Sequence, residues 1–529
     1  MSFDYIIVGA GTAGCVLANR LSEDGKYKVL LLEAGKNDNY HWIHIPIGYL
    51  YCIGNPRTDW GYKTVPEKGL HGRSLLYPRG KVLGGCSSIN GMIYIRGQSA
   101  DYDLWRQKGN VGWGWDDILP YFMKSEDYVD GKSEFHNTGG EWRVDNQRLS
   151  WEVLEKFKDA CIQAGIPETP DFNTGDNEGV GYFKVNQKNG FRVNTAKAFL
   201  RPRKSFKNLK IETQAHVQRI LFDGNKAIGV HYKKNGLDFR VTANKEIILA
   251  AGAIGSPSIL QHSGLGPARL LKRNGIDVIK DMPLIGQNLQ DHLQLRCAYK
   301  VTGVKTLNTE SQGLWGKAKI ALEYAIKRSG PMSMSPSQLG VFVKSHENLT
   351  TPNLQYHIQP ISLDAFGQPL HTFDALTASV CNLRPESRGV VEIATPNPAD
   401  PPRINPNYLS TTNDQLVAAQ SIRITRNIMA QTSLKPYFPE EFSPGAHNQT
   451  DEELIRSAGE IGSTIFHPVG TVQMGPHSEP VDIRLRMRGV SGLRVVDASV
   501  MPSITSGNTN SPTLMIAEKA SDMIKEDAL

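Results

Sequence analysis

Tyr5-Ile6-Ile7-Val8 runs directly into Gly9-Ala10-Gly11-Thr12-Ala13-Gly14, and this stretch decides the fold. The first four residues form a short apolar run of the kind that makes a buried parallel strand. Gly9 permits a tight turn out of the strand, Gly11 lets a pyrophosphate approach the backbone, and Gly14 lets helix and strand pack closely. Residues 15–21 continue with apolar side chains at helical spacing, so a helix N-terminus with free N–H groups would face the phosphates.

A second apolar strand, residues 28–32, ends on Glu33, which stands 24 residues after Gly9. A carboxylate at this place binds ribose hydroxyls. Strand, glycines, helix, strand and acid occur in order within one short unit, which predicts a dinucleotide site rather than a simple glycine-rich turn. The acid also disfavours a 2′-phosphate and hence NADP. This unit does not distinguish FAD from NAD.

The composition excludes several protein classes. With 529 residues, 40% hydrophobic and 21% charged, the chain is predicted to be globular, with two intimately connected domains. The net charge of +6 is slight and the basic residues are scattered, so nucleic acid is not an expected partner. The six cysteines contain no CxxC pair, and no metal site is predicted. Sparse cysteine, an apolar strand beginning by Tyr5 and the lack of a long apolar run predict a cytoplasmic protein without a membrane span.

Several further segments share the character of the first. Residues 79–92 form a loop rich in glycine and serine that could lie flat against a planar ligand or a diphosphate, although a flexible loop would look the same. Residues 246–253 read as a buried strand that ends in small residues, followed by residues 254–266. Gly286-Gln287-Asn288-Leu289-Gln290-Asp291-His292 comes next, and the segments 493–499 and 508–513 lie near the end.

On these ordered motifs the chain resembles the glucose–methanol–choline (GMC) oxidoreductases, in particular their bacterial choline-dehydrogenase-like branch, from residue 3 to about residue 526. The resemblance implies an α/β protein with a Rossmann-like FAD-binding domain, formed by residues 1–160, 205–300 and 466–529. Residues 161–204 and 301–465 would form an interwoven substrate-binding domain. Alternating runs such as residues 354–358 predict that this second domain contains an antiparallel sheet with helices.

The resemblance also implies which residues bind FAD. The loop 79–92 would lie along the pyrophosphate and the isoalloxazine, Val217 would present its backbone to the adenine, and Asp497 and Ala498 would contact the ribityl and phosphate region. Some relatives carry a histidine at the position of Ile89 and tether the flavin covalently, which isoleucine cannot do, so FAD is expected to be noncovalent. The full implied set is Gly9, Gly11, Thr12, Ala13, Gly14, Glu33, Ala34, Arg79, Val82, Gly84, Gly85, Ser87, Asn90, Gly91, Met92, Val217, Ala251, Gly252, Asp497, Ala498, Asn508, Asn510 and Ser511.

Oxidation of an alcohol needs a base for the hydroxyl proton, and histidine is the natural choice. His467 precedes Pro468, which favours an extended backbone. On local grounds alone such a histidine is more often a packed residue, but the resemblance places His467 at the position of the catalytic base. It places Asn510 at the partner position, which is His or Asn in the family. Ser511 as N-cap and Pro512 at the first helical position predict a helix from residue 513 whose dipole faces the flavin.

The substrate is expected to be a small alcohol. Choline-oxidising relatives carry a glutamate shortly after the Asp-His motif, and an ungapped count puts Lys300 there, so a neutral primary alcohol is favoured over choline. The electron acceptor, either oxygen or a quinone or dye, and the oligomeric state stay open. A hydroxynitrile-lyase-like reaction and a photodecarboxylase-like reaction on the same fold are the alternatives.

Overall fold

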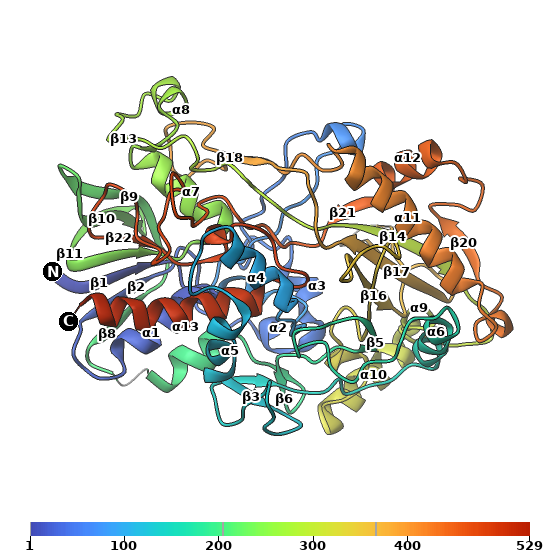
Figure 1. Cartoon of the computed structure of the whole chain (residues 1–529). Helices are drawn as coiled ribbons and strands as arrows, with labels where there is room; N and C mark the ends of the chain where they lie inside the picture. The colour runs from blue at the N-terminus through green and yellow to red at the C-terminus, as the bar shows by residue number, and fades with distance from the viewer. Residues whose placement is uncertain (1, 204–205, 365–367, 529) are drawn as a thin grey trace.

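Two seven-stranded sheets organise the chain and stand side by side (Figure 1). The computed structural model describes residues 2–203, 206–364 and 368–528. Helices cover both sheets, and within the described residues none is long and apolar enough to cross a membrane.

The first sheet is built around the predicted nucleotide-binding strand. β1 (Ser2–Val8) lies between β2 (Val29–Leu32) and β11 (Leu237–Leu249), and pairs with both in parallel. β8 (Leu209–Glu212) and β22 (Leu493–Val495) extend the parallel part, while β9 (Ala215–Asp223) and β10 (Lys226–Lys234) form an antiparallel edge. Ile6 and Ile7 have no exposed surface because layers cover both faces of the sheet.

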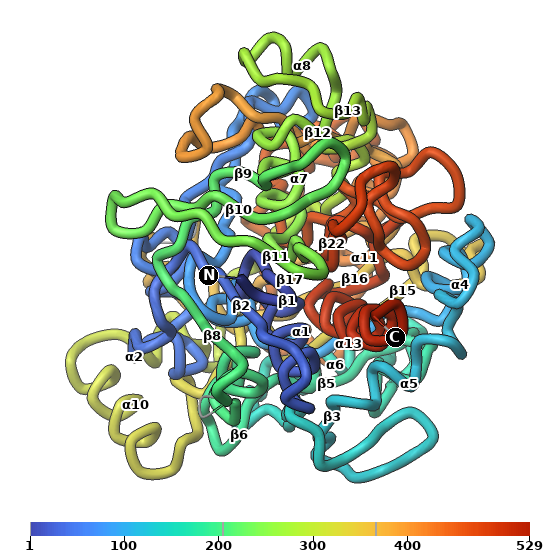
Figure 2. Tube along the Cα trace, turned by 90° about the vertical axis from the view of Figure 1, so that its left-hand side faces the viewer, coloured from blue at the N-terminus to red at the C-terminus, as the bar shows by residue number. Residues whose placement is uncertain are grey.

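Helices α1 (Thr12–Ser22) and α13 (Asn510–Asp527) lie alongside each other on this sheet (Figures 1 and 2). The Arg20 guanidinium joins them, at 2.8 Å from Glu518, and also contacts Glu141 at 2.7 Å. This ion pair therefore joins a helix near the start of the chain to the last helix, in the same helical layer on the first sheet. Helix α7 (Gly252–His262) follows β11 on the same domain.

The predicted start of the last helix is wrong by three residues. Helix α13 begins at Asn510, its N-cap is Thr509, and no side chain makes a capping bond there. Ser511 is thus inside the first turn rather than the cap. Pro512 sits at the third helical position, which is tolerated because the N–H groups of the first turn have no acceptor within the helix.

The second sheet is antiparallel, as predicted. Its order is β20 (Glu440–Ser443), β14 (Leu293–Lys300), β17 (Ala375–Asn382), β16 (Leu354–Gln359), β15 (Leu339–Val343) and β5 (Gly179–Tyr182), with β21 (Gly462–Thr464) paired to β14. Helices α6 (Glu152–Gln163), α11 (Thr412–Met429) and α12 (Asp451–Ile461) contribute to its core.

Two predicted domain boundaries differ from the structure. β14 pairs with β17 over residues 294–300 and belongs to the second sheet, although residues up to 300 were expected in the FAD-binding domain. Helix α6 starts at Glu152 and packs Val153, Leu154 and Phe157 into the second core, although residues up to 160 were expected in the first. β14 directly continues the 286–292 motif and is buried on both sides, so its sequence does not reveal which sheet it joins.

The remaining elements complete the surface. They include α2 (His41–His44), η1 (Pro46–Gly48), α3 (Tyr49–Cys52), α4 (Ser99–Gln107), α5 (Trp115–Lys124), α8 (Ala268–Arg273), α10 (Gly313–Lys327) and η6 (Pro331–Ser333).

Candidate active site

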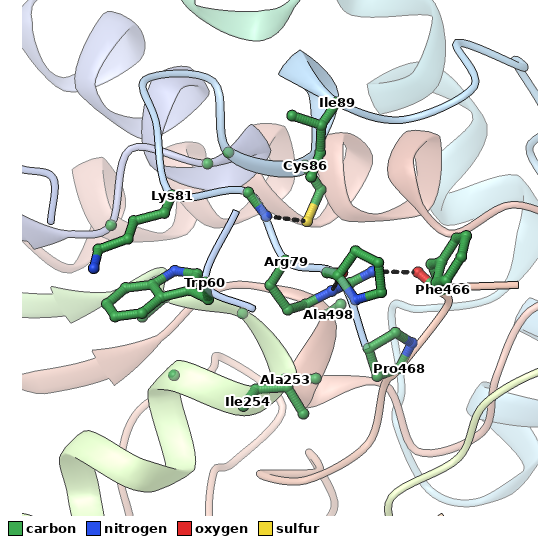
Figure 3. Close-up of a pocket in the computed structure, with 18 of the residues that line it drawn as sticks. Trp60, Arg79, Lys81, Cys86, Ile89, Ala253, Ile254, Phe466, Pro468 and Ala498 are labelled. Carbon is green, nitrogen blue, oxygen red and sulfur yellow. Dashed lines mark hydrogen bonds between the residues drawn. The ribbon is translucent and has the colours of Figure 1, made fainter. Parts of the chain in front are cut away.

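A cavity of about 550 Å³ extends from the carboxyl ends of the parallel strands to the second sheet. Its nucleotide side is formed by residues that follow β1, β2 and β11, and its other side includes Gln294 of β14 and His357 and Gln359 of β16. The loop around Arg79 and Cys86 crosses between the two (Figure 3). Ligands of open α/β sheets bind at this end of the strands.

Two of the three predicted glycines are required by close packing, and the third borders open space in the cavity. A Cβ on Gly9, which has φ +100°, would lie 2.6 Å from the Ala250 carbonyl oxygen, and one on Gly14 would lie 1.8 Å from the Gly9 oxygen. A Cβ on Gly11 would meet no described atom within 4 Å, and Gly11 lines the cavity. Gly11 therefore leaves the backbone at the start of α1 open to a bound group.

Glu33 is held in place by backbone donors. Its two carboxylate oxygens accept hydrogen bonds from the Ala10 N–H (2.9 Å) and the Gly35 N–H (2.7 Å). Burial raises the pKa of this carboxyl to about 7, against the opposing effect of those two bonds. Glu33 lines the cavity beside Ala34, where a carboxylate can accept from ribose hydroxyls.

The polar atoms at the start of α13 fit a diphosphate. Asn510 Oδ1 accepts from the Thr12 hydroxyl at 2.6 Å, so the N-termini of α1 and α13 meet at the cavity. The Asn510 Nδ2 donor is buried without a hydrogen-bond partner among the described residues, and Asn510 lines the cavity. An unsatisfied donor beside two helix N-termini is suited to an anion, so this chain's own residues fit the phosphates of FAD.

Most of the predicted cofactor residues line the cavity, and five do not. Those on the wall are Gly9, Gly11, Thr12, Ala13, Glu33, Ala34, Arg79, Gly85, Asn90, Gly91, Met92, Val217, Ala251, Gly252, Asp497, Ala498, Asn508 and Asn510. Gly14, Val82, Gly84, Ser87 and Ser511 lie behind it. The Ser87 hydroxyl, for example, donates to the Gly84 carbonyl at 2.6 Å and shapes the loop rather than contacting a ligand.

Asp497 supports the wall through protein donors. Its carboxylate accepts from the Gly252 N–H (2.9 Å), the Ser256 hydroxyl (2.6 Å) and the Ser499 N–H (2.8 Å). These bonds tie the start of α7 to the segment after β22. Burial raises the pKa of Asp497, and the hydrogen bonds oppose that effect.

An aromatic group at the nucleotide side was missed. Trp60 stacks on Tyr62, with ring centroids 5.6 Å apart, and lies 5.4 Å from His216. The Lys81 ammonium sits 4.4 Å from the Trp60 ring centroid (Figure 3). All four residues line the cavity near Val217. The aromatic spacing in Trp60-Gly61-Tyr62 was the available signal, but only the fold brings it to β9.

His467 is buried on the other side of the cavity, after an unusual backbone turn. Phe466 has φ +70°, a left-handed conformation that is uncommon for a bulky residue. Its carbonyl accepts from Arg79 Nη2 at 2.6 Å (Figure 3), and its N–H donates to the Thr464 hydroxyl at 2.8 Å. These bonds hold the turn that presents the His467 ring to the cavity.

Asp291 is the anchor of this segment. It is buried, and its Oδ1 accepts from the N–H groups of His292 (3.0 Å) and His467 (2.8 Å). Its Oδ2 accepts from the hydroxyls of Tyr77 (2.9 Å), Tyr408 (2.5 Å) and Thr464 (2.6 Å). Five donors, four of them more than 100 residues from Asp291 in the chain, therefore meet at one carboxylate and fix the backbone of His467.

A chain of hydrogen bonds determines where the His467 ring carries its proton. The Leu383 carbonyl only accepts, so His292 Nε2, at 3.1 Å, must donate to it. Burial lowers the pKa of His292 to about 4, so the ring is neutral near pH 7 and its Nδ1 is an acceptor. His467 Nδ1, 3.1 Å away, must then carry the proton, which leaves a lone pair on His467 Nε2. This is the tautomer that a general base requires.

The amide that meets this lone pair belongs to Asn508 and not to Asn510. Asn508 Nδ2 lies 3.1 Å from His467 Nε2, while Asn508 Oδ1 accepts from the Gln355 amide at 3.3 Å. Asn510 instead bonds Thr12. The prediction that Asn510 is the catalytic partner is therefore corrected by two residues, and His292 and Gln355 join the set of positioning residues.

The environment favours a neutral His467. Burial, followed by the nearby His292, His357 and Arg79, lowers its pKa well below the usual value for histidine. Burial likewise lowers the pKa of His357 to about 3. The lowered pKa therefore favours the neutral imidazole, the form that can accept a proton.

The charged group that acts on His467 from the cavity lining is Arg79. The same lining contains the uncharged Tyr49, Gln294 and Gln359. The carboxylates in the cavity lining are Glu33, Asp400 and Asp497, and none of them is among the causes of the His467 pKa shift.

Lys300 does not belong to this wall. Its ammonium lies 3.8 Å from Glu440 and over the Phe373 ring, with 41% of the side chain exposed. The residue that follows the Asp-His motif into the cavity is Gln294.

Comparison with known proteins matches the chain to two family models, both described as GMC oxidoreductase, over residues 3–294 and 385–517. The chain is 41% identical to the alcohol dehydrogenase [acceptor] of Pseudomonas putida, covering 99% of this chain and 95% of that one. It is 40% identical to the mitochondrial choline dehydrogenase of Homo sapiens, covering 99% and 90%.

Solved structures give the same result. Pyridoxine 4-oxidase from Mesorbium loti superposes with a TM-score of 0.89 at 30% identity, covering 98% of both chains. Formate oxidase from Aspergillus oryzae superposes with a TM-score of 0.92 at 27% identity, covering 99% of this chain and 98% of that one.

Proposed function

The chain belongs to the GMC oxidoreductase family, and from that premise we propose that it oxidises an uncharged primary alcohol to the aldehyde, with His467 as general base and Asn508 as its hydrogen-bonding partner. The family membership makes the protein an FAD-dependent oxidoreductase that acts on CH–OH donors. The base, its partner and the substrate class are the parts that the proposal adds.

The cofactor is held by the nucleotide side of the cavity. Glu33 would accept from the ribose hydroxyls, and the first turns of α1 and α13, with the Asn510 amide, would hold the phosphates. FAD supplies the acceptor for the hydride that leaves the alcohol carbon. Ile89 lines the cavity without a nucleophilic atom, so FAD would not be attached at this position, which supports noncovalent binding.

His467 takes the hydroxyl proton. The alcohol oxygen would replace the present contact between His467 Nε2 and Asn508 Nδ2 and be held by both groups. Its proton passes to the Nε2 lone pair while the C–H bond breaks and the C=O bond forms. His467 Nδ1–H stays bonded to His292, so the ring keeps its orientation as it becomes charged.

Asn508 contributes a donor whose charge does not change with pH. Its Nδ2, 3.1 Å from His467 Nε2, would donate to the alcohol oxygen once that oxygen replaces this contact. Gln355 fixes the amide orientation by donating to Asn508 Oδ1. The donor stabilises negative charge that develops on the oxygen as the proton leaves.

The wall of the cavity supports a neutral substrate. Binding of a quaternary ammonium calls for an aromatic cage or a negative charge. The residue of β14 that lines the cavity after the Asp-His motif is the uncharged Gln294, and no carboxylate is among the charges that shift the pKa of His467. We therefore favour a neutral aliphatic or aromatic alcohol over choline.

The observation that carries the proposal is the run of hydrogen bonds from Leu383 through His292 to His467 and Asn508. The test is anaerobic mixing of the purified yellow protein with neutral alcohols and with choline while the flavin absorbance is followed. Bleaching by a neutral alcohol, strongly slowed in a His467→Ala variant but retained in His262→Ala at the far side of the cavity, is expected. Equal bleaching rates in both variants would refute the role of His467, and faster bleaching by choline would refute the substrate class. Recovery of the colour in air, or only with a quinone, would identify the acceptor.

A further inference from the structure

Helix α10 displays large apolar side chains to solvent. Trp315 is 90% exposed, Leu314 86%, Ile326 71% and Leu322 61%. All four residues lie on one 15-residue helix. Exposed apolar patches of this kind mark contact surfaces.

The exposed apolar residues share one side of the helix. At 100° per residue, Leu314, Trp315, Leu322 and Ile326 fall, with Ala318, Ala321 and Ala325, within an arc of about 140°. All seven are exposed. Lys317, Lys319 and Lys327 are also exposed and stand outside this arc, so the polar flanks are positively charged.

The other side of α10 attaches it to the protein. Tyr324 is buried, and its hydroxyl donates to the Gly190 carbonyl at 2.9 Å. The Tyr324 ring contacts Phe191 edge to face, and the Arg328 guanidinium lies 5.1 Å from the Tyr324 ring centroid. With this side fixed, the apolar arc must face outward. Both views show α10 at the periphery of the molecule, next to α2 (Figures 1 and 2).

The charge around the helix favours an anionic partner. Residues 305–328 contain five basic residues and two acidic ones, although the whole chain is nearly balanced. One of the two acids, Glu323, is half-buried and accepts from the Ser329 hydroxyl. An apolar side with a tryptophan, flanked by lysines, is the pattern of a helix that lies in the interface of a lipid bilayer.

We infer that α10 docks the protein on the surface of a membrane that contains anionic lipids. The helix, about 22 Å long, would lie flat with Leu314, Trp315, Leu322 and Ile326 among the lipid headgroups and upper acyl chains. This attachment is peripheral and is independent of the proposed reaction.

Docking would bring the cavity wall toward the bilayer. The chain leaves α10 through η6, which packs against η1, and then contributes Pro336 and Ser337 to the cavity lining. Tyr49, which directly follows η1, lines the same cavity. An apolar substrate or acceptor dissolved in the membrane would then have a short path to the site.

The test is flotation of the FAD-loaded full-length protein with vesicles of phosphatidylcholine, with and without 30% phosphatidylglycerol. Binding to the anionic vesicles is expected, with weaker binding at high salt because the lysine contribution is screened. Replacement of Leu314, Trp315, Leu322 and Ile326 by Gln should lower the bound fraction about tenfold or more, because the apolar insertion is lost. Brominated lipids should quench tryptophan fluorescence of the native protein, and less so in Trp315→Phe.

The matched control replaces Val111, in the turn between α4 and α5, and Leu237, at the start of β11, by Gln; they are 70% and 64% exposed. This variant should bind vesicles like the native protein, and both variants should keep their alcohol-dependent flavin reduction in solution. Native protein that does not float with anionic vesicles would overturn the inference. So would a native dimer that the α10 variant converts to a monomer without any vesicle binding, since the arc would then bind a second copy of the chain.

Discussion

Replacement of His292 by leucine should slow the reaction although His292 does not line the cavity. In the native protein His292 Nδ1 accepts a hydrogen bond from His467 Nδ1–H at 3.1 Å, and leucine offers no acceptor there. A buried N–H without a partner costs roughly 1–3 kcal/mol. The His467 ring avoids a buried, unpaired Nδ1–H if it carries its proton on Nε2 instead. In that tautomer Nε2 has no lone pair and cannot accept the substrate proton.

The expected effect follows from the same energy. If the active tautomer is disfavoured by about 1–3 kcal/mol, flavin reduction slows by roughly 5- to 150-fold, since each 1.36 kcal/mol is a factor of ten. The assay is stopped-flow flavin reduction under anaerobic conditions. The loss should be the same at pH 7 and pH 8, because both tautomers are neutral and their ratio does not depend on pH.

His292→Asn is the matched control. Its Oδ1 can take the place of the ring Nδ1 and accept from His467, so the rate should stay within a few-fold of the native value. Native flavin spectra in both variants would show that the site is intact. A leucine variant as fast as the native protein, or an asparagine variant as slow as the leucine variant, would refute the tautomer argument.

Three further predictions concern neighbouring groups. Asn508→Ala should slow flavin reduction about tenfold or more with little change in FAD affinity. Asn510→Ala should instead weaken FAD binding, measured by flavin fluorescence on dilution. The reverse pattern would show that Asn510 is the catalytic partner of His467. Gly14→Ala should yield little folded, flavin-bound protein, because the added Cβ would lie 1.8 Å from the Gly9 oxygen, and a native melting temperature would contradict this. His357 is buried with a pKa of about 3, so below pH 6.5 only the unfolded chain binds its proton and the fold loses stability. His357→Leu should therefore reduce the pH dependence of the unfolding free energy by up to about 1.4 kcal/mol per pH unit between pH 6 and 4, measured by urea titration. An unchanged dependence would contradict the lowered pKa.

The sequence was sufficient for the strand, turn and helix that open the first sheet, for a local reason. Residues 5–33 contain strand, turn, helix, strand and acid in one continuous unit, and each part is determined by its neighbours in the chain. β1, α1 and β2 appear as predicted, and Glu33 lies on the cavity wall.

The catalytic half depends on contacts that no local pattern encodes. Asn508 and Asn510 are equivalent candidates in Asn508-Thr509-Asn510, and the choice rests on where α13 begins. Successive helical residues are 100° apart, so a small error in the helix start turns a side chain from one wall of the cavity to another. The left-handed turn at Phe466 is likewise fixed by Arg79, 387 residues away in the chain.

The sequence count placed Lys300 in the substrate wall, but the residue of β14 that lines the cavity is Gln294. Gln294 and Lys300 are both on β14, six residues apart, and a strand advances about 3.3 Å per residue. The ungapped count therefore placed the residue about 20 Å too far along the sheet. Only the pairing of β14 in the second sheet shows which of its residues reaches the cavity.

The last strand and the last helix of the chain complete the first domain, which has a consequence for biosynthesis. β22 pairs with the first sheet, and α13 packs on α1. β11 receives β22 as its last parallel neighbour, and α13 covers α1, which was made almost 500 residues earlier. The apolar residues of α1 that await α13 stay uncovered while the chain is synthesised, so the nascent protein must be kept from aggregating until translation ends. Premature termination near the last helix should therefore yield insoluble protein that is degraded, rather than a shortened enzyme with reduced activity.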